Sequence, residues 1–203
     1  MMEVKPVTLT GNVVRLEPLS EAHVPGLAAI GLNNDIWRWM PYGAMRDEPD
    51  LRKWVQEMLN RKKHGADFPF AVIHLATGRV AGATRYMDIH PRDYALEIGG
   101  TWYGVEFQRT GVNTEAKYLL LRHAFEELKC IRVQIKTDLR NERSQKAIER
   151  IGAVREGVLR NNMIMPDGYK RSSVYYSILD TEWPAVKARF VEMMKDKYKV
   201  DKA

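Results

Sequence analysis

The stretch from Leu96 to Thr137 changes its hydrophobic period twice, and this restricts the possible folds more than any other feature of the chain. From Val112 to Lys129, apolar residues recur every three or four positions, as on the buried face of a helix. Directly afterwards, Ile131 to Thr137 alternates apolar and polar residues, as a half-buried strand does. Another strand, Leu96 to Tyr103, precedes the helix. This alternation predicts a mixed α/β domain.

Turn residues, helix caps and periodicity predict the remaining elements, and no repeat or linker divides them. We expect one continuous domain, residues 1–203, with a mostly antiparallel sheet of about seven strands. The other predicted strands are 7–9, 13–16, 68–75, 79–87, 154–165 and 171–179. The other predicted helices are 20–31, 49–63, 142–151 and one that begins near Thr181.

Composition narrows the class of protein. With 203 residues, 45% hydrophobic and 29% charged, the chain suits a single globular domain, and no stretch reaches the ~20 apolar residues of a membrane span. Its first residues lack the pattern of a secretory signal, so we expect a cytoplasmic protein without a membrane partner. Cys130 is the only cysteine, which excludes an intrachain disulfide and a cysteine-based zinc site. We interpret it as a small buried residue and expect no metal.

A glycine-containing loop between the strand ending at Tyr103 and the long helix is the most informative segment. The loop enters the helix through Gln108-Arg109-Thr110-Gly111-Val112-Asn113. Unpaired backbone N–H groups and the helix dipole make such a junction an anion site. The alternative is that Gly111 only forms a tight turn. The loop has too few glycines for a nucleotide triphosphatase, and no Lys-Ser or Lys-Thr pair follows it.

These six residues resemble the Gln/Arg-x-x-Gly-x-Gly/Ala pyrophosphate loop of GNAT N-acetyltransferases. The resemblance extends over about residues 9–190 and is strongest with the branch of ribosomal-protein N-terminal acetyltransferases. The matching pieces are 16–19, 97–99, 114–116, 124–126, 132–133, 141–144, 151–153, 156–160, 167–168, 176–177 and 182–183. Asn113 departs from the pattern, which prefers glycine or alanine there. Asparagine still offers its backbone N–H.

The resemblance implies acetyl-CoA as cosubstrate, held where two neighbouring parallel strands splay apart. It implies that the N–H groups of Trp102 and Tyr103 hold the pantetheine and the thioester carbonyl, which gives an oxyanion hole. It assigns to the pyrophosphate the N–H groups of Arg109, Thr110, Gly111, Val112, Asn113 and Thr114, and it makes Gln108 a further cofactor-binding residue. Asn141 would contact the pantetheine, and Ser144 would lie near the sulfur as a proton donor, with Tyr103 in reserve. The alternative for Asn141 and Ser144 is a local role in capping their helix.

Acceptor residues are less clearly marked. The amine must lose a proton before it attacks, and Glu97 is our first candidate for a base acting through water, followed by Asp88 and His90. We expect the acceptor pocket to include Trp37, Trp39 and Tyr42, together with Asp88; the aromatic residues could instead belong to the core. The acceptor stays open between a protein N-terminus, a polyamine, an amino acid and an amine-bearing antibiotic.

Other functions remain possible at this stage. A noncatalytic acyl-CoA-binding module would keep the same fold, and a different donor such as succinyl-CoA would use the same chemistry. The formal charge of +6 indicates an anionic partner, but no nucleic-acid-binding motif accompanies it, so we do not expect direct nucleic-acid binding. The resemblance also implies a homodimer, for which the sequence identifies no interface.

Overall fold

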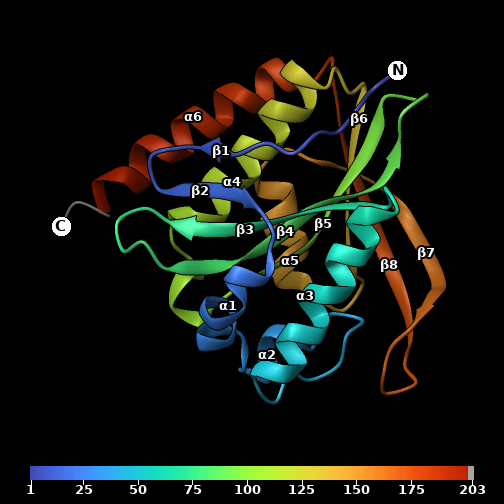
Figure 1. Ribbon diagram of the computed structural model, residues 1–203. Coiled ribbons are helices and arrows are strands. Elements are labelled where there is room, and N and C mark those ends of the chain that lie inside the picture. Colours follow the sequence, from blue (N-terminus) through green and yellow to red (C-terminus); the bar gives the residue numbers. More distant parts are fainter. Residues whose placement is uncertain (201–203) are drawn as a thin grey trace.

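The computed structural model describes residues 1–200, with side chains up to Lys195, and is built on one mixed sheet. The sheet has eight strands in the order β1-β2-β3-β4-β5-β6-β8-β7, where the sequence predicted about seven (Figure 1). The strands are β1 Leu9–Thr10, β2 Val14–Pro18, β3 Asp67–His74, β4 Val80–His90, β5 Ala95–Tyr103, β6 Arg132–Asp138, β7 Val154–Ile164 and β8 Lys170–Leu179. Each of the eight overlaps a strand segment predicted from the sequence, including the short edge strand β1, so only the total of about seven was too low. The predicted mixed α/β class is confirmed.

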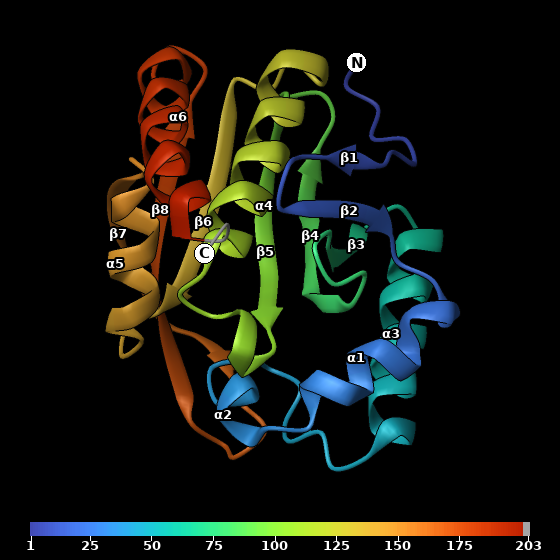
Figure 2. The same ribbon diagram turned by 90° about the vertical axis from the view of Figure 1, so that its left-hand side faces the viewer.

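Helices cover both faces of this sheet. They are α1 Val24–Gly31, α2 Asn34–Trp37, α3 Glu48–Lys63, α4 Gly111–Arg122, α5 Glu142–Arg150 and α6 Trp183–Val200. The sequence did not predict α2, which has only four residues. The predicted helix from Val112 to Lys129 is α4 extended by a π-helical turn, His123–Glu127. In Figure 2, α4 and α6 lie side by side.

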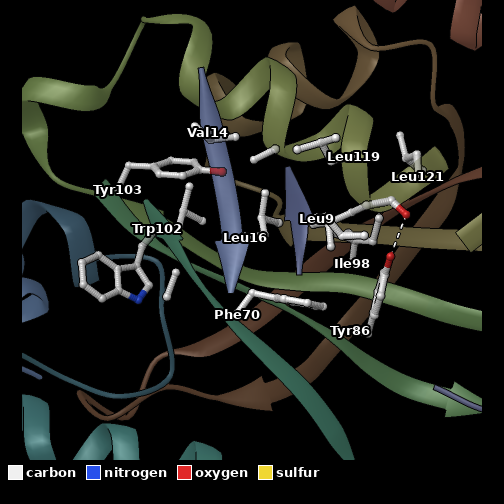
Figure 3. Packing of buried hydrophobic residues seen from close by; sticks show 14 of the residues in the cluster. Leu9, Val14, Leu16, Phe70, Tyr86, Ile98, Trp102, Tyr103, Leu119 and Leu121 are labelled. Carbon is white, nitrogen blue, oxygen red and sulfur yellow. Dashed lines mark hydrogen bonds between the residues drawn. The ribbon is translucent and has the colours of Figure 1, made fainter. Parts of the chain in front are cut away.

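Two consecutive residues of β4 show how the faces are divided, because successive side chains of a strand point to opposite sides. Arg85 reaches the α3 side, where its Nη1 donates to the sulfur of Met58 at 2.7 Å. Tyr86 points to the α4 side, where its hydroxyl donates to the carbonyl of Leu120 at 2.7 Å (Figure 3). The sheet is therefore the middle layer of a three-layer domain.

The core is continuous across these layers, and its largest fully buried side chains include Tyr86, Tyr176, Phe70 and Phe190. Cys130 is buried between the π-helical turn and β6, as expected. None of the helices in the described part of the chain is long and apolar enough to cross a membrane.

A buried carboxylate joins the N-terminal hairpin to α4. Glu115 is 2% exposed, and its two oxygens accept hydrogen bonds from the backbone N–H groups of Asn12, Val13 and Val14 at 2.9, 2.6 and 2.7 Å. Strand β2 begins at Val14, so these contacts fix the start of that strand against the helix that carries the predicted anion site.

Candidate active site at the splayed strands

The parallel strands β5 and β6 separate partway along their length. They pair only at Ala95–Arg132, Leu96–Val133 and Glu97–Gln134, although β5 continues to Tyr103 and β6 to Asp138. This confirms the splayed strand pair that the family resemblance implied. Beyond Glu97, β5 stays paired with β4 but faces no partner on β6 in the described register, so backbone groups on its β6 side can reach a ligand.

A bulge in β5 explains where the strands part. Arg85 of β4 pairs with Gly99, whereas Ala83 pairs with Trp102, so β5 carries one extra residue between these pairs. Gly100 has φ 57°, and a Cβ there would lie 2.9 Å from the guanidinium carbon of Arg85. Glycine is needed for both reasons. Because bulges bend and twist a strand, this one turns the end of β5 away from β6.

A cavity of about 620 Å³ fills the gap between the separated strands. Its walls come from α2 and the loop after it, β4, β5, the start of α4, β6, α5 and β8. The basic side chains on these walls are Arg85, Arg109, Lys117, Lys136, Arg143, Arg150 and Arg171, and the acidic ones are Asp35 and Glu97. This excess of positive charge suits an anionic ligand.

The start of α4 closes one end of the cavity with the geometry expected of an anion site. Thr110 is the N-cap; its hydroxyl accepts from the N–H of Val112 at 3.3 Å and donates to the carbonyl of Phe107 at 2.7 Å. Arg109 has φ 64°, an uncommon value that turns the chain into the helix. Arg109, Thr110 and Asn113 line the cavity, while Gly111, Val112 and Thr114 are buried behind them.

Gln108 connects this junction to its neighbours. Its side-chain amide donates to the carbonyl of Tyr103 at 3.1 Å and accepts from Arg143 of α5 at 3.0 Å. The residue lines the cavity. These bonds position the loop and α5 on either side of the ligand space.

Asn141 and Ser144 stand in the first turn of α5, on the cavity wall. The side-chain oxygen of Asn141 accepts from the backbone N–H of Ser144 at 3.1 Å, so the capping role considered for Asn141 is present. Ser144 is half-buried, and the structure describes no hydrogen bond of its hydroxyl within the protein. That hydroxyl can therefore serve a ligand.

Glu97 lies where β5 and β6 make their last pair. It is 2% exposed and accepts from Gln134 Nε2 at 2.9 Å and from Lys136 Nζ at 2.8 Å, both on β6. Its carboxylate thus lines the cavity as one half of a buried ion pair. Asp88 and His90, the other candidate bases, are exposed and pair with each other at 3.0 Å, away from the described cavity walls.

Trp102 and Tyr103 point to opposite sides of β5 (Figure 3). The Tyr103 side chain points toward Val14, and its hydroxyl is buried with no hydrogen-bond partner in the described residues. Burial raises the pKa of Tyr103 above its ordinary value. The geometry places this hydroxyl in the core, whereas Ser144 lies on the cavity wall.

The predicted acceptor residues divide between wall and core. Trp39 and Tyr42 line the cavity, and Arg171 of β8 holds their loop by donating to the carbonyl of Trp39 at 3.0 Å. Trp37 is 2% exposed, and its ring centroid lies 4.8 Å from that of Trp102. Of the four residues predicted to contact the acceptor, the described cavity walls include only Trp39 and Tyr42.

Two buried residues on this cavity were not predicted from the sequence: Lys117 and Arg171, which are 8% and 6% exposed. The burial of Lys117 could have been inferred from the sequence, because it lies one turn before Leu120 and Leu121 on the apolar side of its helix. The place of Arg171 could not, because its partner Trp39 lies 132 positions away in the chain.

Comparisons with known proteins agree with this geometry. Residues 14–154 match the family model of the acetyltransferase (GNAT) domain. YdaF of Bacillus subtilis (strain 168), provisionally named a ribosomal N-acetyltransferase, is 40% identical over 113 residues, which are 56% of this chain and 61% of YdaF. The chain therefore covers less than two thirds of the length of that relative.

Two further relatives match over most of their length. The ribosomal-protein-serine acetyltransferase of Escherichia coli (strain K12) is 25% identical over 174 residues, which are 83% of this chain and 94% of that protein. A crystal structure from T. thermophilus, provisionally described as an acetyltransferase, is 41% identical, has a TM-score of 0.86 and matches 95% of this chain and 99% of its own.

Proposed function

The chain belongs to the GNAT acetyltransferase family, and we propose that this enzyme acetylates the N-terminal α-amine of a protein with acetyl-CoA as donor. The observation that carries the proposal is the separation of β5 from β6 around a cavity that ends at the start of α4. The names of the two curated relatives support a ribosomal protein as the acceptor.

The residues on the cavity fit acetyl-CoA. Its phosphates need N–H donors and positive charge, which the start of α4 and the basic side chains supply. The N–H groups of Trp102 and Tyr103 are assigned to the pantetheine and the thioester carbonyl, and Asn141 to the pantetheine. When bound, acetyl-CoA supplies the acyl group as a thioester; one fixed donor to the developing oxyanion can stabilise the transition state by ~3 kcal/mol.

An α-amine is the acceptor that this chemistry favours. A lysine ε-amine with a pKa of ~10.4 is neutral in roughly one molecule per few thousand at pH 7, whereas an α-amine near ~8 is neutral in about one in ten. Glu97 is the proposed carboxylate of the proton path. Trp39 and Tyr42 are assigned to the acceptor, which enters beneath the loop that Arg171 holds.

We expect acetylation to be confined to the peptide N-terminus. The substrates to compare are a peptide with a free N-terminal serine and an internal lysine, the same peptide with its N-terminus already acetylated, and a polyamine. Mass spectrometry should place the acetyl group on the α-amine, and the blocked peptide should stay unmodified. Acetylation of the lysine or of the polyamine alone would show that the acceptor has been assigned wrongly.

Replacing Ser144 with alanine should lower kcat by about 100-fold, because the leaving thiolate loses its proton donor. The dissociation constant of CoA should change little, since the pyrophosphate contacts remain. A thiol-release assay and calorimetric titration measure the two quantities. An unchanged kcat would remove Ser144 from the mechanism. Substitution of Ser172 on β8 is the matched control, since Ser172 is not among the described cavity residues.

The proposal includes a cytoplasmic location and a homodimer, both implied by the family resemblance. Sedimentation of the purified protein tests the second of these. Competition between acetyl-CoA and succinyl-CoA in the same thiol-release assay measures the preference for acetyl over longer acyl groups.

A further inference from the structure

A lysine side chain is buried beside the point where the strands separate. Lys117 lies on α4, is 8% exposed and lines the cavity. Its Nζ donates to the hydroxyl of Thr101 on β5 at 2.8 Å, and that hydroxyl shares a hydrogen bond of 2.8 Å with Thr84 of β4. In the described part of the chain, no carboxylate oxygen forms an ion pair with it. Lys117 is thus held by a hydroxyl pair and faces the ligand space.

Such a position is costly for an ammonium group. A buried charge without a close counter-ion shifts toward its neutral form, and buried lysines take part in base catalysis for this reason. Here burial lowers the pKa of Lys117 to about 7, against the opposing effect of the Glu97 carboxylate. Near neutral pH, a large fraction of the Lys117 amines has a free lone pair.

The other charged groups around the cavity do not offer the same capacity. The carboxylate of Glu97 is already bound by Lys136 and Gln134 of β6. The remaining charged wall residues are Asp35 of α2, Arg85 of β4, Arg109 before α4, Arg143 and Arg150 of α5, and Arg171 of β8. Arginine stays protonated in proteins. Lys117 is the wall residue best prepared to accept a proton.

The hydrogen bond to Thr101 of β5 puts the amine of Lys117 near the proposed reaction centre. Thr101, its partner, directly follows the bulge at Gly100 and precedes Trp102, whose N–H is assigned to the thioester. Ser144 stands on the same cavity wall from α5, and Trp39 and Tyr42 stand on the acceptor side. A proton acceptor here would lie between the donor and the acceptor sides.

We propose that Lys117 is the base that takes the proton from the acceptor's ammonium group. This rests on the proposed N-acetyltransferase function and refines it: Glu97 stabilises the protonated lysine, and Lys117 itself accepts the proton. The N–H bond of the ammonium breaks and the lysine lone pair gains the proton. The freed amine forms the C–N bond as the C–S bond breaks, a second amine proton passes to the thiolate through Ser144, and Lys117 releases its proton to water.

The decisive variants are Lys117→Met, which keeps the length without a base, and Lys117→Arg, which keeps the charge but cannot deprotonate. Both should lower kcat by about 100-fold, while the CoA dissociation constant stays within about twofold of wild type. In wild type, kcat should rise with pH around 7; in Lys117→Met the rise should move to the acceptor amine's own pKa of ~8. Exposed Lys53 of α3, changed to methionine, is the matched control.

Three results would overturn the assignment: unchanged kcat in both variants, recovery of activity by arginine, or a wild-type kcat that falls as pH rises through 7. Recovery by arginine, or a kcat that falls with rising pH, would mean that the enzyme needs a positive charge at position 117 and not a neutral amine. If the wild-type enzyme acetylates no amine at all, the proposed function fails instead.

A second readout does not require turnover. Because the unfolded lysine keeps its ordinary pKa near 10.5, the unfolded state binds more protons than the folded state between pH 7 and that value. The free energy of unfolding should therefore rise with pH over this window in wild type, relative to Lys117→Met. Urea denaturation at pH 7 and pH 9 measures it. Equal pH dependence in the two proteins would show that folded Lys117 keeps its proton and cannot act as the base.

Discussion

Replacing Gly111 with glutamate is expected to weaken CoA binding by at least about 100-fold, which corresponds to about 2.7 kcal/mol. Gly111 is the first residue of α4, buried directly behind the cavity-lining residues Thr110 and Asn113. A carboxylate placed there would repel the pyrophosphate from the N–H groups proposed to hold it. Calorimetric titration with CoA and acetyl-CoA measures the loss.

A matched substitution distinguishes the effect of a negative charge at the proposed CoA site from the effect of a negative charge elsewhere on the protein. Gly157 of β7 has no other heavy atom within 4 Å of an added Cβ, so Gly157→Glu introduces the same charge away from the cavity. This control should bind CoA like wild type, and thermal unfolding should show that Gly111→Glu still folds. Normal CoA affinity in a folded Gly111→Glu protein would mean that the ligand binds elsewhere, and the proposed donor site would fall.

Replacing Glu115 with alanine is expected to destabilise the fold by about 3–5 kcal/mol, because several backbone N–H groups lose their acceptor at a cost of about 1–3 kcal/mol for each buried one. The carboxylate accepts hydrogen bonds from the backbone N–H groups of Asn12, Val13 and Val14, and burial of Val13 and Val14 leaves their donors little access to water in its place. At 2–4 °C per kcal/mol for a protein of this size, the melting temperature should drop by roughly 6–20 °C. Differential scanning calorimetry measures the change.

The control for this prediction is Glu57→Ala. Glu57 is also a helical glutamate, but it is exposed on α3, so its loss should change stability by no more than ~0.5 kcal/mol. If Glu115→Ala melts like Glu57→Ala, the hydrogen bonds to the N-terminal hairpin do not hold β2 against α4. Glu115→Ala should lower stability without changing CoA affinity, because Glu115 is not among the described residues of the cavity.

Much of the proposed donor site could be outlined from the sequence because its features are local. Strand β5, a short loop and α4 follow one another directly in the chain, and hydrogen bonds between near neighbours fix the junction. The same holds for Asn141 and Ser144, which belong to one helical turn. Periodicity also located the long helix and the strand after it, since burial repeats along each element with its own period.

Contacts between residues far apart in the sequence decided which side chains line the cavity and which lie in the core. Nothing near Trp37 in the sequence distinguishes it from Trp39, yet packing against Trp102 puts one in the core and the carbonyl bond from Arg171 holds the other at the cavity. The parting of β5 from β6 depends on a bulge that only pairing with β4 reveals. The amine of Lys117 acquires its environment from strands that pack against its helix. The sequence thus determined the elements and the local geometry of the proposed anion site. The fold determined which side chains share the cavity, because burial and charge at a point are set by residues that the chain brings there from distant positions.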